Sequence, residues 1–216
     1  MKKYDYIFFD LDGTLSESGP GLINCVAFAL NSIGIEVSDR EELRKFVGPP
    51  LIESFSMFYG LSPEQIQIAV RNFRAQYEAS GIFENEMYDG VDILLKKLCD
   101  AGKVPVVATS KPEPFARKIL QRYSIDKYFL YIAGSGIDET RTKKAEVIAY
   151  ALEACKISDK SKVVMVGDRF HDVIGARENG IDCIGVLFGY GERKDLEDAG
   201  AVAIAADVNE LTEMLL

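Results

Sequence analysis

Short apolar runs alternate with segments of helical periodicity along most of this 216-residue chain. The runs occupy residues 6–9, 104–108, 129–133, 163–166, 183–187 and, more weakly, 202–205. Runs that are this short and apolar throughout are typical of buried parallel strands. Strands that alternate with helices predict an α/β fold with a parallel sheet between two helical layers, a three-layer Rossmann-like core.

One long segment interrupts this alternation directly after the first strand. Residues 16–85 contain no convincing strand, and their apolar residues recur at helical spacing. Within this segment, Ser62-Pro63 is a typical helix start, because serine caps the first turn and proline fits into it. We therefore expect an α/β core of residues 1–15 and 86–216, with an all-helical domain of residues 16–85 inserted into it.

Composition narrows the function classes. The net charge of −9 is unsuited to binding nucleic acid, and no apolar stretch is long enough to span a membrane. Asp5 and Asp10 interrupt the apolar run near the start, so a signal peptide is not expected. The four cysteines are widely spaced, without a CxxC pair, and we expect free thiols in a reducing cytoplasm. No coiled-coil heptad is present, which favours a monomer or a weak homodimer.

Polar side chains follow three of the predicted core strands. Asp10 and Asp12 end the first run, Thr109 ends the second, and Asp168 and Asp172 follow the fourth. Ligands of open α/β sheets bind at the carboxyl ends of the strands, so these side chains are expected to share one site. Carboxylate oxygens from two strand ends suit a hard cation such as Mg²⁺.

Residues beside these acids are suited to holding a phosphoryl group. Gly13 allows a tight turn that brings backbone N–H groups close to an anion, and Thr14 follows it. Thr109 and Ser110 offer hydroxyl and N–H donors at the end of the next core strand. With Lys111, these are the predicted phosphate-binding residues of the core.

The stretches DLDGT, ATSKP, TKKAEVI and GDRFHD resemble, in this order, the four motifs of the haloacid dehalogenase superfamily of phosphohydrolases. The resemblance covers essentially the whole chain and includes the helical insertion, which corresponds to a cap domain. TSKP and DETRTKKAEVI resemble the 5′-nucleotidase-like branch more than typical phosphoglycolate phosphatases, while Gly48-Pro49-Pro50 resembles the cap loop of the latter.

The resemblance implies a role for each catalytic residue. Asp10 would attack phosphorus and form an aspartyl-phosphate, and Asp12 would act as general acid and then general base. Thr109 would hold the phosphoryl group. A lysine would offset its charge, and we place this role on Lys144 rather than Lys143, because Lys144 directly precedes a helical pattern.

The resemblance also implies a Mg²⁺ site and a substrate class. Asp10, the backbone carbonyl of Asp12, and Asp168 would hold the ion, with Asp172 as a further ligand or an orienting group. The substrate would be a small phosphomonoester, either phosphoglycolate or a nucleoside 5′-monophosphate.

Two alternative functions stay open on the sequence. One is a phosphosugar mutase of the β-phosphoglucomutase type, and the other is a phosphoacceptor receiver domain, which lacks a helical insertion. Within the insertion, Arg44 and Lys45 stand before the stiff Gly48-Pro49-Pro50 turn and are the candidate substrate-binding residues of the cap. His171 is expected to be an ordinary turn residue, and Gly189-x-Gly191 to be a loop.

Overall fold

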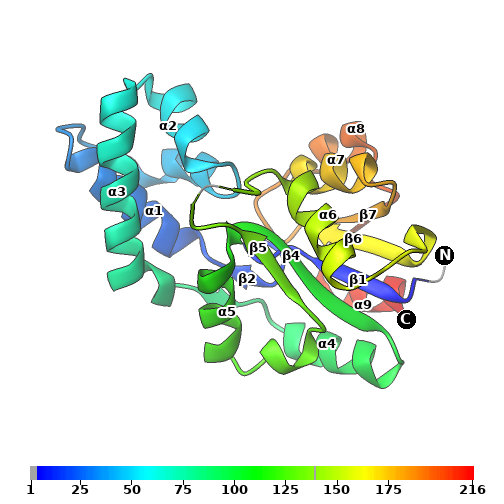
Figure 1. The fold of residues 1–216 in the computed structure, drawn as a ribbon. Coiled ribbons are helices and arrows are strands. Elements are labelled where there is room, and N and C mark those ends of the chain that lie inside the picture. Colours follow the sequence, from blue (N-terminus) through cyan, green and yellow to red (C-terminus); the bar gives the residue numbers. More distant parts are fainter. Residues whose placement is uncertain (1–3, 139) are drawn as a thin grey trace. The chain divides into compact units, whose positions relative to one another are not determined.

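The structure is a computed structural model that describes residues 4–138 and 140–216 (Figure 1). The chain divides into two compact units. One contains the residues up to Ser16 together with Met87–Leu216, and the other contains Glu17–Glu86. The division therefore falls beside the predicted limits of the helical insertion.

The first unit is built on a six-stranded sheet in the order β5-β4-β1-β6-β7-β8, in which the paired strands run parallel. Its strands are β1 (Tyr6–Phe9), β4 (Val104–Pro112), β5 (Ile132–Ser135), β6 (Val163–Gly167), β7 (Asp182–Val186) and β8 (Ala203–Ala205). The predicted α/β class with a parallel sheet is confirmed.

Helices cover both faces of this sheet (Figure 1). On one face lie α4 (Val91–Asp100), α5 (Glu113–Arg122) and α9 (Val208–Leu215); on the other lie α6 (Lys144–Ala154), α7 (Phe170–Glu178) and α8 (Arg193–Ala199). The short 3-10 helices η3 (Asp126–Tyr128) and η4 (Lys160–Lys162) lie in connections. Side chains such as Phe8, Met165 and Val147 fill the core under α6 and α7. Their burial is the main stabilising contribution of this layer.

The predicted limits of two strands were clearly wrong. We expected the second strand to end at residue 108, whereas β4 continues to Pro112, and β5 differs at both ends. We expected residues 129–133, whereas β5 extends to Gly134 and Ser135, which are buried. A strand predicted from its run of apolar residues ends at Ala133, because the next two residues are small and one of them is polar. At the other end, Phe129 directly follows the 3-10 turn η3.

The second unit is helical. It contains α1 (Gly19–Asn31), α2 (Leu51–Tyr59), α3 (Pro63–Ala79) and the 3-10 helices η1 (Arg40–Phe46) and η2 (Gly81–Phe83). Helix α3 begins as predicted at Ser62, whose hydroxyl accepts a hydrogen bond from the backbone N–H of Gln65 in a capping box. Two-residue strands, β2 (Ser16–Glu17) and β3 (Glu86–Met87), form a separate small sheet. Among the described residues, no helix is long and apolar enough to cross a bilayer.

The strand register of the core unit decides what lies at its carboxyl edge. Phe9, the last residue of β1, pairs with Val107 of β4 and Val166 of β6. Asp10 therefore emerges level with the end of β6, and its backbone N–H donates to the carbonyl of Val166 at 2.9 Å. Strand β4 continues past this level to Pro112.

Candidate active site

Three buried carboxylates meet at the carboxyl edge of the core sheet. Asp10 follows β1, Asp168 follows β6, and Asp172 lies in the first turn of α7. Each can offer an oxygen such that these atoms lie within 4.8 Å of one another. Three carboxylates at this spacing are a donor set suited to a divalent cation with oxygen ligands.

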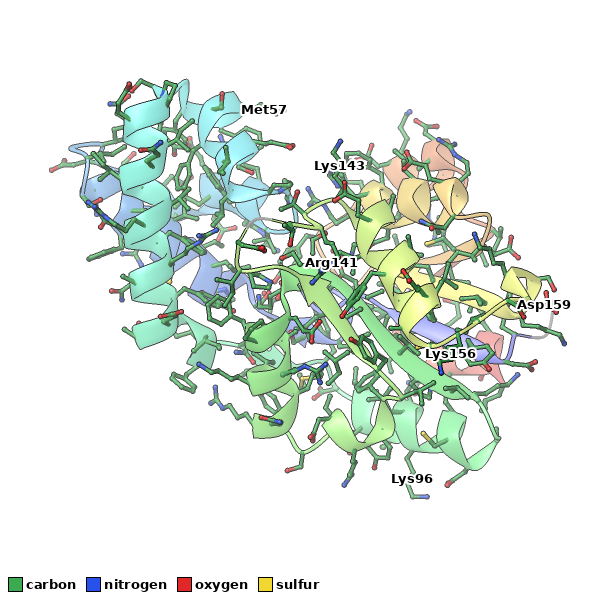
Figure 2. The ribbon with its side chains drawn as sticks, in the orientation of Figure 1. Met57, Lys96, Arg141, Lys143, Lys156 and Asp159 are labelled. Carbon is green, nitrogen blue, oxygen red and sulfur yellow. The ribbon has the colours of Figure 1, made fainter. Side chains whose placement is uncertain are left out.

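Lys144 supplies positive charge to this cluster from the start of α6. Its Nζ lies 2.8 Å from Asp10 Oδ1 and 2.8 Å from Asp172 Oδ1, and it donates to the carbonyl of Ala108 at 3.1 Å. The neighbouring Lys143, labelled in Figure 2, is exposed and caps α6. Lys144, the lysine that we favoured on the sequence, is thus the one that contacts Asp10.

The cluster carries more negative charge than Lys144 offsets. Burial, followed by repulsion from Asp172 and Asp10, raises the pKa of Asp168 to about 8. Burial also raises the pKa of Asp10 to about 6, although Lys144 opposes this rise. Burial disfavours the charged form of Lys144, but the Asp10 and Asp172 carboxylates outweigh it and raise its pKa. A bound divalent cation would relieve this excess, so the residues fit such an ion.

Backbone groups and a hydroxyl fix the orientation of two of the acids. The backbone N–H of Tyr190 donates to Asp168 Oδ2 at 2.8 Å, and the Thr14 hydroxyl donates to Asp168 Oδ1 at 3.3 Å. The backbone N–H of Arg169 donates to Asp172 Oδ2 at 3.0 Å, which caps α7 and leaves Oδ1 toward Lys144. The sequence did not single out Tyr190 or Arg169, because a backbone donor leaves no residue-type signal.

Two glycines allow the chain to pack directly against Asp168. Gly13 has a φ of +79°, and a Cβ at this residue would lie less than 3.0 Å from the Asp168 carboxyl group. A Cβ at Gly189 would likewise overlap Asp168 and the backbone of Gly13. Gly189 lies in the Gly189-x-Gly191 segment that we expected to be a loop. This pair of glycines is the one sequence feature that indicates the close packing against Asp168.

Asp12 and Lys111 form an ion pair beside the cluster. Lys111 Nζ lies 2.8 Å from Oδ1 and 2.8 Å from Oδ2 of Asp12. Their side chains are only 4% and 13% exposed, so the pair is largely withdrawn from water. Two of the predicted site residues are therefore brought together in a way that the sequence did not indicate.

The remaining predicted core residues also lie at this edge. Thr109 is buried, and its hydroxyl accepts a hydrogen bond from the backbone N–H of Lys111 at 3.2 Å. Ser110 is half-buried. The regular pairing of β4 with β5 is interrupted between Ala108 and Pro112, so the backbone of residues 109–111 departs from the regular ladder.

The predicted cap residues belong to the helical unit. Arg44 and Lys45 lie in the last turn of η1 and are exposed. Arg44 forms an ion pair with Glu41 at 3.3 Å, and the Lys45 ammonium lies 5.0 Å from the ring centroid of Phe58. In the core unit, His171 stacks on Phe170 with ring centroids 3.9 Å apart. The substrate-binding role of Arg44 and Lys45 stays a prediction.

Comparison with known proteins identifies the family. The haloacid dehalogenase-like hydrolase family matches residues 7–186. The crystal structure of a predicted phosphatase from Clostridium acetobutylicum superposes with a TM-score of 0.95 at 42% identity, covering 99% of this chain and 98% of that one. The chain belongs to the haloacid dehalogenase-like hydrolases. It is a phosphatase of that family, as the sequence predicted.

The relatives of this chain carry different names. A 5′-nucleotidase of Pseudomonas aeruginosa is 38% identical over 99% of this chain and 96% of its own length. The tyrosine-protein kinase PtkA of Mycobacterium tuberculosis is 40% identical over 97% of this chain and 72% of its own length. A phosphoglycolate phosphatase of Vibrio cholerae is 27% identical over 100% of this chain and 99% of its own.

Proposed function

We propose that this chain hydrolyses a small phosphomonoester through an aspartyl-phosphate on Asp10, with Mg²⁺ as cofactor. The observation that carries the proposal is the contact of a buried Asp10 carboxylate with the Lys144 ammonium at 2.8 Å, beside two further acids. A carboxylate held next to a cation at a strand end can attack the phosphorus of a bound dianion, because Lys144 offsets the repulsion between the two anions.

The reaction needs two steps, both centred on phosphorus. First, an Asp10 oxygen bonds to phosphorus while the bond to the ester oxygen breaks, and Asp12 donates a proton to the departing alkoxide. Water then attacks phosphorus, Asp12 takes its proton, and the bond between phosphorus and Asp10 breaks to release phosphate. Mg²⁺, held by Asp10, Asp168 and Asp172 with the Asp12 carbonyl, would neutralise charge on the transferring group.

The phosphoryl group itself would be held by donors of the first two strand ends. The Thr109 hydroxyl and the backbone N–H of Ser110 lie where β4 leaves its regular pairing. The Gly13-Thr14 turn, which follows β1, lies against Asp168. These donors recognise only the phosphoryl group, so the choice of alcohol must be made elsewhere.

The substrate that we favour is a nucleoside 5′-monophosphate, with phosphoglycolate as the other member of the class. The name of the Pseudomonas relative supports the first and that of the Vibrio relative the second. The test is phosphate release from a panel of nucleoside monophosphates, phosphoglycolate and sugar phosphates. A chain that releases phosphate from none of them would contradict the proposal.

We expect metal removal to abolish activity reversibly. EDTA should stop phosphate release and Mg²⁺ should restore it, whereas Ca²⁺ should inhibit, since its looser coordination misplaces the attacking oxygen. Mg²⁺ at a hundred times its dissociation constant should also stabilise the fold by about 2.7 kcal/mol, visible as a higher melting temperature. Full turnover after extraction of all bound metal would contradict the proposed cofactor.

We expect the basic residues of η1 to act on the part of the substrate beyond the phosphoryl group. Arg44→Ala and Lys45→Ala should raise KM for a nucleotide or for phosphoglycolate, which carry further polar or anionic groups. They should leave p-nitrophenyl phosphate nearly unchanged, since its leaving group offers no second anion. Equal losses of activity on both substrates, or no loss on either, would show that these residues do not determine substrate specificity.

A second candidate function, suggested by the name of the PtkA relative, is transfer of the phosphoryl group to tyrosine. In that reaction a tyrosine hydroxyl would take the place of water. The two functions separate by product: the phosphatase releases inorganic phosphate, and a tyrosine kinase leaves phosphotyrosine on a peptide. The mutase alternative would instead yield a phosphorylated isomer without steady phosphate release.

A further inference from the structure

Two buried lysines form ion pairs with different acids of the site. Among the described residues, three lysines are buried: Lys103, Lys111 and Lys144. Lys144 contacts Asp10 and Asp172, whereas Lys111 contacts Asp12. Asp10 and Asp12 are separated by one residue, yet each is paired with a different lysine from a different element.

The strand β4 explains how Lys111 reaches Asp12. Pairing places Phe9, the end of β1, beside Val107, while β4 continues to Pro112 and so extends past the end of its neighbour. Alternate side chains of a strand share a face, and Thr109 and Lys111 are both buried while Ser110 is half-buried. The side of β4 that presents Thr109 toward Asp10 therefore also presents Lys111 toward the turn that carries Asp12.

The contact itself is well suited to fixing a carboxylate. Nζ is equidistant from both oxygens at 2.8 Å, so rotation of the carboxylate about its last torsion would lengthen one of two charge-assisted contacts. Removal from water strengthens the pair, since solvent screens it less than a surface ion pair. A general acid or base must lie within hydrogen-bond reach of its proton partner, which requires such a fixed position.

We propose that Lys111 is a positioning residue that acts through Asp12: it holds the Asp12 carboxylate where protons enter and leave the reaction. This inference rests on the acid–base role of Asp12 in the proposed function. It differs from direct binding of the phosphoryl group by Lys111, and the two roles make opposite predictions when Asp12 is removed.

The test is a double-mutant cycle between Lys111→Met and Asp12→Asn, measured on the purified full chain with Mg²⁺. Asp12→Asn should slow formation of the phospho-enzyme from an alkyl phosphate far more than its formation from p-nitrophenyl phosphate, whose leaving group barely needs a proton. Lys111→Met should show the same substrate pattern, with a loss of about tenfold, or about 1.4 kcal/mol, on the alkyl phosphate. In the Asp12→Asn background, Lys111→Met should cost less than about twofold.

The matched control is Lys103→Met. Lys103 is as buried as Lys111, with both residues 7% exposed, and it immediately precedes β4, at the opposite end of the same strand. Its ammonium donates to the backbone carbonyl of Tyr4. Lys103→Met should leave the ratio of rates on the two substrates at the wild-type value, whatever it does to stability.

The outcomes separate the proposals. Equal losses from Lys111→Met with and without Asp12 would show that Lys111 binds the phosphoryl group directly and would overturn the positioning role. If Lys111→Met folds poorly, the cycle is repeated with Lys111→Gln. Urea unfolding of the four members of the cycle then measures their stability alongside their activity. Coupling in stability without coupling in kcat would also overturn the positioning role. Absence of phosphate release from the wild type would instead contradict the proposed function.

Discussion

Replacing Asp10 by asparagine should reduce phosphate release by about four orders of magnitude or more, equivalent to about 5 kcal/mol of transition-state stabilisation. Asparagine keeps the shape of the side chain but removes the anion that attacks phosphorus. The contact of Lys144 with this residue at 2.8 Å then lacks its charged partner. Steady-state phosphate release with a nucleotide and with p-nitrophenyl phosphate measures the loss, and both substrates should be affected.

The matched control for this variant is Asp5→Asn. Asp5 lies at the other end of β1, where it forms an exposed ion pair with Lys162 at 3.6 Å. Exposed ion pairs contribute little to the free energy of unfolding, so the activity and stability of Asp5→Asn should stay near wild type. A folded Asp10→Asn protein that kept more than about a tenth of the wild-type kcat would contradict the nucleophile assignment.

Grouping of the acids could be predicted from sequence because it depends on strand ends alone. Once residues 6–9 and 163–166 are recognised as parallel strands, Asp10 and Asp168 must emerge at one edge. Asp172 follows four residues later on the first turn of α7, and the family resemblance supplied the order of the motifs. None of these inferences needs the exact length of a strand.

The partners of the acids could not be predicted, because they depend on details beyond pattern. Lys111 reaches Asp12 because β4 extends past β1 and loses its regular pairing between Ala108 and Pro112. Asp168 is oriented by the backbone N–H of Tyr190, and any residue type could supply that group. The misplaced end of β5 has the same origin, since Gly134 and Ser135 carry no apolar signal although the fold buries them.

The choice between two adjacent lysines gives the second large effect. Lys144→Met should destabilise the metal-free protein by about 3–5 kcal/mol, because it removes the ammonium that pairs with two of the three buried carboxylates and leaves their charge uncompensated. Lys143→Met is the matched control: Lys143 is exposed, and its loss should cost no more than about 0.5 kcal/mol. Urea unfolding in EDTA measures both values.

Activity separates the catalytic part of this effect from the structural part. Bound Mg²⁺ offsets part of the carboxylate charge, so saturating Mg²⁺ should recover much of the stability of Lys144→Met. It should not recover turnover, which we expect to stay about a thousandfold below wild type, because the cation beside the attacking oxygen of Asp10 is still missing. If Lys143→Met lost turnover while Lys144→Met kept it, the ammonium that serves Asp10 during the reaction would come from Lys143, and the contact of Lys144 with Asp10 and Asp172 would be structural only.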